Sequence, residues 1–163
     1  MHKRLVVLLP LLLAAALLLV TAEVEVKSVS LEDLSLNMTW RVVPAPKPVE
    51  PILRGGSASI RVKVVNGAFF PVESTIRCRF WLEGEPAGEL EERVSLKPGV
   101  NELIFTMPLK PGSNVKSVLY EFAGMRSVPL YYRVEVTLGG SSAQEEGSFR
   151  VSLPKPRLPG QRF

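Results

Sequence analysis

The chain has 163 residues, a formal net charge of +4, one cysteine and one histidine. A single cysteine excludes an intramolecular disulfide. Because the only histidine is at position 2, a histidine-based catalytic triad and a histidine-containing zinc site are excluded from the rest of the chain. The length suits one domain with its own core, and the small positive surplus gives no reason to expect a nucleic acid or another acidic partner.

The first twenty-two residues have the pattern of a membrane-targeting segment. Met1–Arg4 is cationic and Leu5–Val20 is an unbroken apolar stretch, with Val20 and Ala22 at the −3 and −1 positions of a cleavage site. A helix over Leu5–Ala22 is about 27 Å long, close to the thickness of a bilayer core, so a retained anchor is equally compatible. The sequence therefore predicts an extracytoplasmic protein, either secreted or held in the membrane through residues 1–22.

After this segment the dominant pattern is alternation of apolar and polar residues, which predicts half-buried β-strands. The alternating runs are 24–31, 34–42, 59–64, 76–82, 94–96, 103–107, 132–138 and 149–153, and 115–122 suits either a strand or a short helical crossover. The predicted turns are 66–67, 84–88, 97–99 and 108–112, with a polar loop over 139–147. The Pro-rich stretch 44–51 lacks amides that a central strand needs and is expected to run along an edge.

Strands of this length and spacing predict an all-β fold. We expect an Ig-like antiparallel β-sandwich of seven or eight strands over residues 23–153, preceded by one N-terminal hydrophobic helix. Residues 154–163 are Pro-rich and basic and are expected to form a flexible tail. Without a disulfide the domain must rely on packing. Fifteen of the sixteen acidic residues are Glu, a bias typical of archaeal or thermophilic proteins.

Several stretches resemble known sandwich families. The segments Gly55–Gly67, Phe80–Gly84 and Leu96–Gly99, with a late Tyr-containing strand, resemble prokaryotic immunoglobulin-like adhesion and surface modules. The stretch Val64–Gly88 is also similar to the LEA-14 or WHy domain, although Gly67 stands where that pattern commonly has proline. Both resemblances imply an Ig-like sandwich, and neither implies a catalytic residue.

No arrangement of residues points to catalysis or to a metal. Cys78 falls on the apolar phase of its strand, which favours a core residue over a reactive thiolate. The acidic clusters at 89–92 and Glu145–Glu146 are typical of solvated strand edges and loops. Calcium sites are usually rich in Asp, whereas this chain has only Asp33, and it has no Gly-rich phosphate loop. We expect no enzyme activity, no metal and no cofactor.

Four cations suggest an interaction face. Arg61 and Lys63 on one strand, and Arg77 and Arg79 on the next, would share an outer face if those two strands pair as a hairpin across the Asn-Gly turn. Such a face would suit an anionic polysaccharide, a lipid headgroup or a neighbouring subunit. The alternative is an ordinary solvated sheet face on which acidic residues lie between the cations.

Two aromatic residues suggest a second interaction feature. Trp81 and Tyr131 fall on the outward phase of their strands, where exposed aromatic rings can anchor a partner or stack on sugars. The alternative is that a loop, the Pro-rich segment or the second sheet covers these rings.

Asn37-Met38-Thr39 is an N-glycosylation sequon in a chain that is predicted to be exported. Asn37 lies on the outward phase of its run, so attachment of a glycan is sterically feasible.

Two functions of different classes fit these features. The first is a membrane-anchored or secreted, non-catalytic interaction module of the cell envelope that binds another envelope protein or a glycan. The second is a self-associating subunit of an extracellular filament or surface layer, in which residues 23–31 of one copy complete the sheet of the next after cleavage at Ala22.

Overall fold

The computed structural model describes residues 9–17, 23–42, 49–82, 84–110 and 127–153. Residues 9–17 form a helix, and within the described parts of the chain no helix is long and apolar enough to cross a membrane. The described residues include neither the rest of the predicted targeting segment, nor the segment 115–122, nor the predicted tail 154–163.

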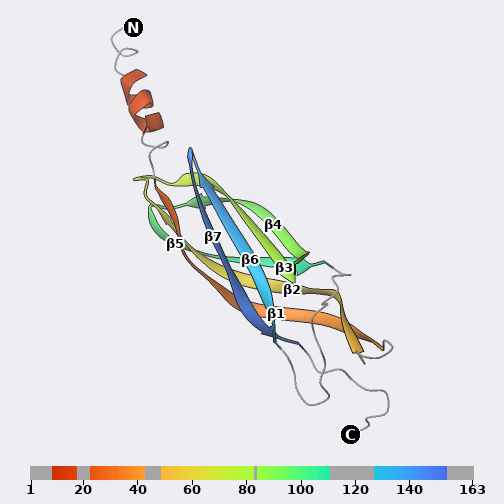
Figure 1. The fold of residues 1–163 in the computed structure, drawn as a ribbon. Helices are drawn as coiled ribbons and strands as arrows, with labels where there is room; N and C mark the ends of the chain where they lie inside the picture. The colour runs from red at the N-terminus through yellow and green to blue at the C-terminus, as the bar shows by residue number, and fades with distance from the viewer. Residues whose placement is uncertain (1–8, 18–22, 43–48, 83, 111–126, 154–163) are drawn as a thin grey trace.

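Seven β-strands make up the rest of the described chain. They are β1 (Val24–Val42), β2 (Val49–Asn66), β3 (Val72–Leu82), β4 (Glu85–Leu96), β5 (Gly99–Leu109), β6 (Ser127–Leu138) and β7 (Ser141–Ser152). They form a three-stranded sheet with the order β1-β2-β5 and a four-stranded sheet with the order β4-β3-β6-β7 (Figure 1). Every pairing is antiparallel. The predicted all-β antiparallel sandwich is thereby confirmed, with seven strands.

The weak alternation over residues 24–31 has a structural cause in β1. This strand is continuous, but its register with β2 skips Lys27 and then Glu32, which are two β-bulges. Each extra residue shifts the phase of alternation by one, so Val26 and Val29 both pack against the core although they are three positions apart. The two predicted runs are therefore one bulged strand.

Several predicted connections are wrong in extent because they are partly strand, and one of them is 108–112, whose first two residues belong to β5. Pro51 belongs to β2, which tolerates it because β5 pairs only with Gly56 and the residues after it, so one side of β2 is open at Pro51. The predicted turn over 84–88 leads directly into β4 at Glu85. The predicted loop over 139–147 lies largely in β7, an edge strand whose open side can be solvated and therefore accepts polar residues.

The inner faces of the two sheets meet in one apolar core. Its largest fully buried side chains include Phe80, Leu53, Ile60, Ile76, Leu82, Leu96, Met107, Leu130, Leu138 and Leu153. Each such side chain contributes about 1.5–3 kcal/mol by leaving water. Cys78 lies in this cluster at 1% exposure, as its apolar phase predicts.

Asn66 controls the step from the first sheet to the second. Its side chain is 2% exposed, and its Nδ2 donates to the Leu96 carbonyl oxygen at 2.9 Å and to the Phe70 carbonyl oxygen at 3.3 Å. Its Oδ1 accepts a hydrogen bond from the Ala68 amide at 2.8 Å. Asn66 therefore joins the end of β2 to the end of β4 and fixes the loop that leads into β3.

We expect Phe80→Ala to lower the free energy of unfolding by about 3–5 kcal/mol, because it leaves a cavity in the core. The matched control is Phe69→Ala, since Phe69 is 85% exposed and its loss should change stability by less than about 0.5 kcal/mol. Chemical denaturation of both variants measures the difference. Equal effects would contradict the placement of these two rings.

We expect the Cys78 thiol to be inert in the folded protein. Burial, with a smaller contribution from Glu92, raises its pKa to about 12, so almost no thiolate is present near about pH 8. A chromogenic disulfide reagent should label it only after addition of denaturant. Rapid stoichiometric labelling of the native protein would show that Cys78 is not in the core.

Candidate binding face

The four cations that the sequence groups together lie on two different faces. Arg61 and Lys63 are on β2 in the three-stranded sheet, whereas Arg77 and Arg79 are on β3 in the four-stranded sheet. The predicted hairpin of these two strands is wrong, because the chain crosses between sheets after Asn66 instead of turning back on itself. The outer surfaces of a sandwich point in opposite directions, so the cations do not form one patch.

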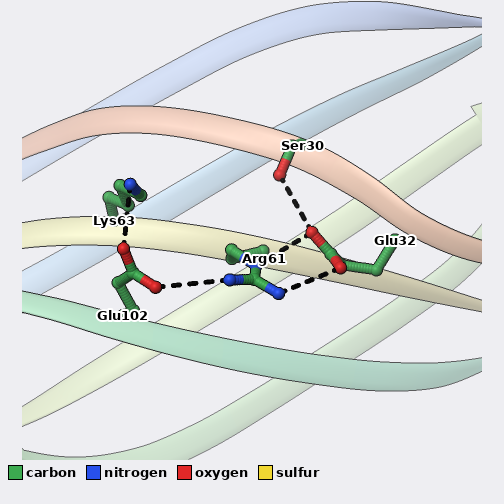
Figure 2. A network of polar contacts seen from close by, with 5 residues as sticks. All are labelled: Ser30, Glu32, Arg61, Lys63 and Glu102. Atoms are coloured by element: carbon green, nitrogen blue, oxygen red, sulfur yellow. Dashed lines mark hydrogen bonds and ion pairs between the residues drawn. The ribbon is translucent and has the colours of Figure 1, made fainter.

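On the three-stranded sheet the cations belong to a ladder of alternating charge (Figure 2). Arg61 binds both carboxylate oxygens of Glu32, with Nε–Oε1 and Nη2–Oε2 distances of 2.8 and 3.1 Å. Its Nη1 lies 3.3 Å from Glu102 Oε2, and Lys63 Nζ lies 2.8 Å from Glu102 Oε1. The hydrogen bond from Lys63 and its charge lower the pKa of Glu102, and the hydrogen bond to Glu32 raises that of Arg61. This face is a mutually neutralised, solvated surface.

The four-stranded sheet has a similar ladder on part of its outer face. Arg77 Nε donates to Glu91 Oε2 at 2.7 Å, and Arg79 Nε donates to Glu89 Oε1 at 3.0 Å. Arg77 Nη1 also lies 4.0 Å from Glu135 on β6. The acidic cluster at 89–92 is therefore largely engaged with arginines along the β3–β4 pairing. Neither pair of cations is free to bind an anion without displacing these carboxylates.

The two aromatic residues are brought together on the four-stranded sheet. The register of β3 with β6 places Trp81 directly opposite Tyr131, although the two are fifty positions apart in sequence. Tyr131 is 48% exposed, and the guanidinium carbon of Arg133 lies 5.8 Å from the centroid of the Trp81 ring. Arg133 Nε is 2.5 Å from Glu146 Oε1 on β7, an ion pair whose geometry is not that of a hydrogen bond. This contact fixes the arginine beside the indole ring.

A shallow depression of about 420 Å³ adjoins these residues. It is lined by Trp81, Tyr131, Tyr132, Arg133, Glu146, Gly147 and Ser148. A neighbouring depression of about 460 Å³ shares Ser148 and is lined also by Ser127, Pro129, Phe149 and Arg150. Tyr131 pairs with Ser148 and Pro129 pairs with Arg150, so the two depressions follow the same pair of strands. We call this surface, from Arg133 and Trp81 to Ser127, the β6–β7 strip.

The inner side of the strip is rigid. The ring of Tyr132 stacks on that of Phe149 with centroids 4.6 Å apart, and both rings pack with the core. A Cβ atom at Gly147 would lie 2.5 Å from the Tyr132 hydroxyl oxygen, so the glycine leaves room for the tyrosine at the edge of the sheet. The strip therefore rests on packed aromatic residues and not on a loop.

The alternation in sequence identifies only part of this strip. It assigns Trp81 and Tyr131 to outward positions, and Arg133 shares the phase of Tyr131, so it was accessible to the same reasoning. Arg150 likewise lies on the outward phase of the predicted run 149–153, whereas Glu146 and Gly147 are missed because the predicted loop over 139–147 occupies positions where β7 runs.

Asn37 lies on β1 with its side chain exposed, opposite Gly55 on β2. The Oγ1 atom of Thr39, the last residue of the sequon, accepts a hydrogen bond from Arg54 Nε at 2.9 Å. Glycosylation at Asn37 stays a prediction.

Residues 23–31, the predicted donor segment, begin next to Gly67 and run along β1. From Val24 onward they pair with β2 of the same chain. Strand addition between copies would first have to separate this pairing.

In the described residues no group of three or more His, Cys, Asp or Glu side chains is arranged to hold a metal ion.

No protein-family model matches the sequence, and no curated protein matches it significantly. Among solved structures, a β-glucuronidase from glycoside hydrolase family 2 matches with a TM-score of 0.48 and 6% identity, over 78% of this chain and 12% of that one. A putative β-galactosidase from Bacteroides fragilis matches with a TM-score of 0.45 and 14% identity, over 72% of this chain and 16% of that one.

A protein from Archaeoglobus fulgidus matches with a TM-score of 0.41 and 17% identity, over 79% of this chain and 100% of that one. The chain thus spans only a small part of the two glycosidases that it matches. At these TM-scores and identities no activity is transferred, and the sandwich assignment rests on the strands described above.

The charge ladders predict a loss of stability in acid. Hydrogen bonds from Lys63 and Arg79 lower the pKa values of Glu102 and Glu89, respectively, from the ordinary value of 4.5. A carboxylate with a lowered pKa stabilises the fold above its unfolded pKa, and this stabilisation disappears as the pH falls through the folded pKa. We therefore expect Tm to fall as the pH drops from about 5 to about 3.

The double variant Glu89→Gln/Glu102→Gln should show a smaller fall in Tm over the same range. Glu73→Gln is the matched control, because Glu73 is an exposed glutamate on β3 outside the ladders. Differential scanning calorimetry at several pH values makes the comparison. An unchanged pH dependence in the double variant would contradict the role assigned to these ion pairs.

Proposed function

We propose that the chain is a non-catalytic binding module of the cell envelope, secreted or anchored through residues 1–22, whose β6–β7 strip binds a glycan. The observation that supports this most directly is the pairing of Trp81 with Tyr131 beside Arg133 on the outer face of a rigid sheet. The ring of Tyr131 is 48% exposed, so a flat ligand that covers it removes apolar surface from water, which favours binding.

The chemistry of the strip suits a sugar chain better than an apolar protein surface. Aromatic faces stack on the C–H faces of sugar rings, while Arg133, Glu146 and Ser148 supply donors and acceptors for hydroxyl groups. From Arg133 to Ser127 the strip is about 20 Å long at about 3.3 Å per residue, which suits an extended ligand. The depressions are shallow and open, so they suit a chain that lies along the surface.

The same residues argue against catalysis at this surface. Histidine is absent from the exported part of the chain, and Cys78 is buried in the core. Glu146, the carboxylate within the strip, is ion-paired with Arg133. A glycosidase needs two carboxylates on either side of the scissile bond, and the strip supplies one.

Glycan binding can be tested with the full chain purified in detergent. Retention on insoluble envelope polysaccharides and titration calorimetry with soluble fragments measure affinity. Trp81→Ala and Tyr131→Ala should each weaken binding about tenfold, equivalent to about 1.4 kcal/mol, because each removes a stacking surface.

Two control variants lie on the opposite face. Ile104→Ala removes an apolar side chain that is 60% exposed, and Arg61→Ala removes a cation of the three-stranded ladder. Both should leave affinity unchanged. Binding that responds to Arg61→Ala but not to Trp81→Ala would overturn the assignment of the strip, and failure to retain any polysaccharide would overturn the glycan as ligand.

A further inference from the structure

The end of the sandwich where β1 begins exposes two large apolar side chains. Phe69, in the loop between β2 and β3, is 85% exposed, and Val100, at the start of β5, is 67% exposed. In the described part of the chain no large apolar side chain is more exposed than Phe69. The two positions lie at the same end because Asn66, three residues before Phe69, pairs with Gly99. We call Phe69 and Val100 the apolar tip.

The exposure of Phe69 does not come from a loose loop. Ala68 before it is 7% exposed, and Phe70 after it packs against the core. The Asn66 side chain holds both neighbours through the Ala68 amide and the Phe70 carbonyl oxygen. The loop is therefore held by hydrogen bonds of its own, while the Phe69 ring is exposed to solvent.

The turn that presents Val100 is ordered in the same way. Asn101 Oδ1 accepts the Lys97 amide at 2.9 Å, and Asn101 Nδ2 donates to the carbonyl oxygens of Lys97 and Gly99 at 2.8 and 3.1 Å. The Lys97 side chain is exposed beside this turn. A cation next to two apolar side chains is a composition that suits the boundary between lipid headgroups and acyl chains.

The path of the chain indicates which surface the apolar tip contacts. The Gly67 amide donates to the Glu23 carbonyl oxygen at 2.8 Å, and a Cβ atom at Gly67 would lie 2.8 Å from that same oxygen. Glu23 directly follows the predicted targeting segment, residues 1–22. Glu23, which contacts the loop that contains Phe69, is therefore the first residue after that segment. Figure 1 shows helix 9–17 beyond this end of the sandwich.

We propose that Phe69 and Val100 insert into the surface of the membrane that holds residues 5–22, so that the sandwich stands on its apolar tip. This inference rests on the membrane attachment in the proposed function. Lys97 contributes a contact with lipid phosphates, whereas the exposed Glu23 offsets its charge, so apolar insertion dominates.

The orientation has a consequence for the β6–β7 strip. β3 leaves the tip at Val72, which pairs with Leu96, and reaches Trp81 nine positions later. At about 3.3 Å per residue this separates Trp81 from the tip by about 30 Å. A sandwich that stands on its tip therefore presents the strip at its far end, away from the bilayer and accessible to a glycan of the envelope.

The test uses the full chain, with residues 1–22 intact, reconstituted in phosphatidylcholine vesicles that contain acyl-chain-brominated lipid. Bromine quenches a tryptophan only when the ring reaches the acyl chains. The Phe69→Trp variant should show a blue-shifted emission and lose about half or more of its added fluorescence. The matched variant is Ile104→Trp, which also adds one exposed tryptophan, but on the outer face of the three-stranded sheet. Its added fluorescence should not be quenched.

Two results would overturn the proposal: equal quenching of the two variants, or recovery of the full chain without vesicles on flotation. Glycan binding, measured on the same vesicles, separates this inference from the proposed function. If Phe69→Trp is quenched and Trp81→Ala has no effect on glycan binding, membrane insertion of the apolar tip stands and glycan binding by the β6–β7 strip is rejected. If glycan binding requires Trp81 and Phe69→Trp is not quenched, glycan binding by the strip stands and membrane insertion of the tip is rejected.

Discussion

The hydrogen bonds of Asn66 are the constraint on which the arrangement of the two sheets depends. Its side chain reaches from the end of β2 to the Leu96 carbonyl oxygen at the end of β4, and it holds the loop between β2 and β3 on the way. A buried amide that loses such partners costs about 1–3 kcal/mol. After this loop the chain enters the second sheet, where β3 lies with β4, β6 and β7, whereas β5 returns to the first sheet.

This crossing divides the polar residues between two outer surfaces with different properties. The three-stranded surface has Arg61, Lys63 and their acidic partners, which neutralise one another. The four-stranded surface has a comparable ladder toward the β4 side and an aromatic, hydrogen-bonding strip toward β6 and β7. Each exposed ion pair adds only a small amount to stability, and together the pairs engage Arg61, Lys63, Arg77 and Arg79 with carboxylates. The strip lies beside these ladders and combines the exposed Tyr131 with the Arg133–Glu146 ion pair.

The two ends of the sandwich also differ in the side chains that they present. At one end the chain enters at Glu23, and the loops held by Asn66 and Asn101 present Phe69 and Val100. Toward the other end lie Trp81 and Tyr131, and the β1–β2 ribbon with Asn37 continues beyond Gly56, the first residue of β2 that pairs with β5. Long strands with a core packed by apolar side chains hold these ends apart without a disulfide.

The sequence by itself determined which side is buried in the strands that alternate regularly, because successive side chains of a strand point to opposite faces. The bulges of β1 and the polar first half of β7 hide this pattern. The sequence therefore assigned Cys78 to the core and Trp81, Tyr131 and Asn37 to the surface, and it predicted the sandwich. Only the tertiary structure decided which strands are neighbours. Asn-Gly closes a hairpin in many proteins, and here the acceptor that redirects it, the Leu96 carbonyl oxygen, is thirty positions away. Pairing between distant strands is set by packing of whole sheets, which no local pattern encodes. For this reason only the fold revealed the separation of the cations, the pairing of Trp81 with β6 and the course of β7.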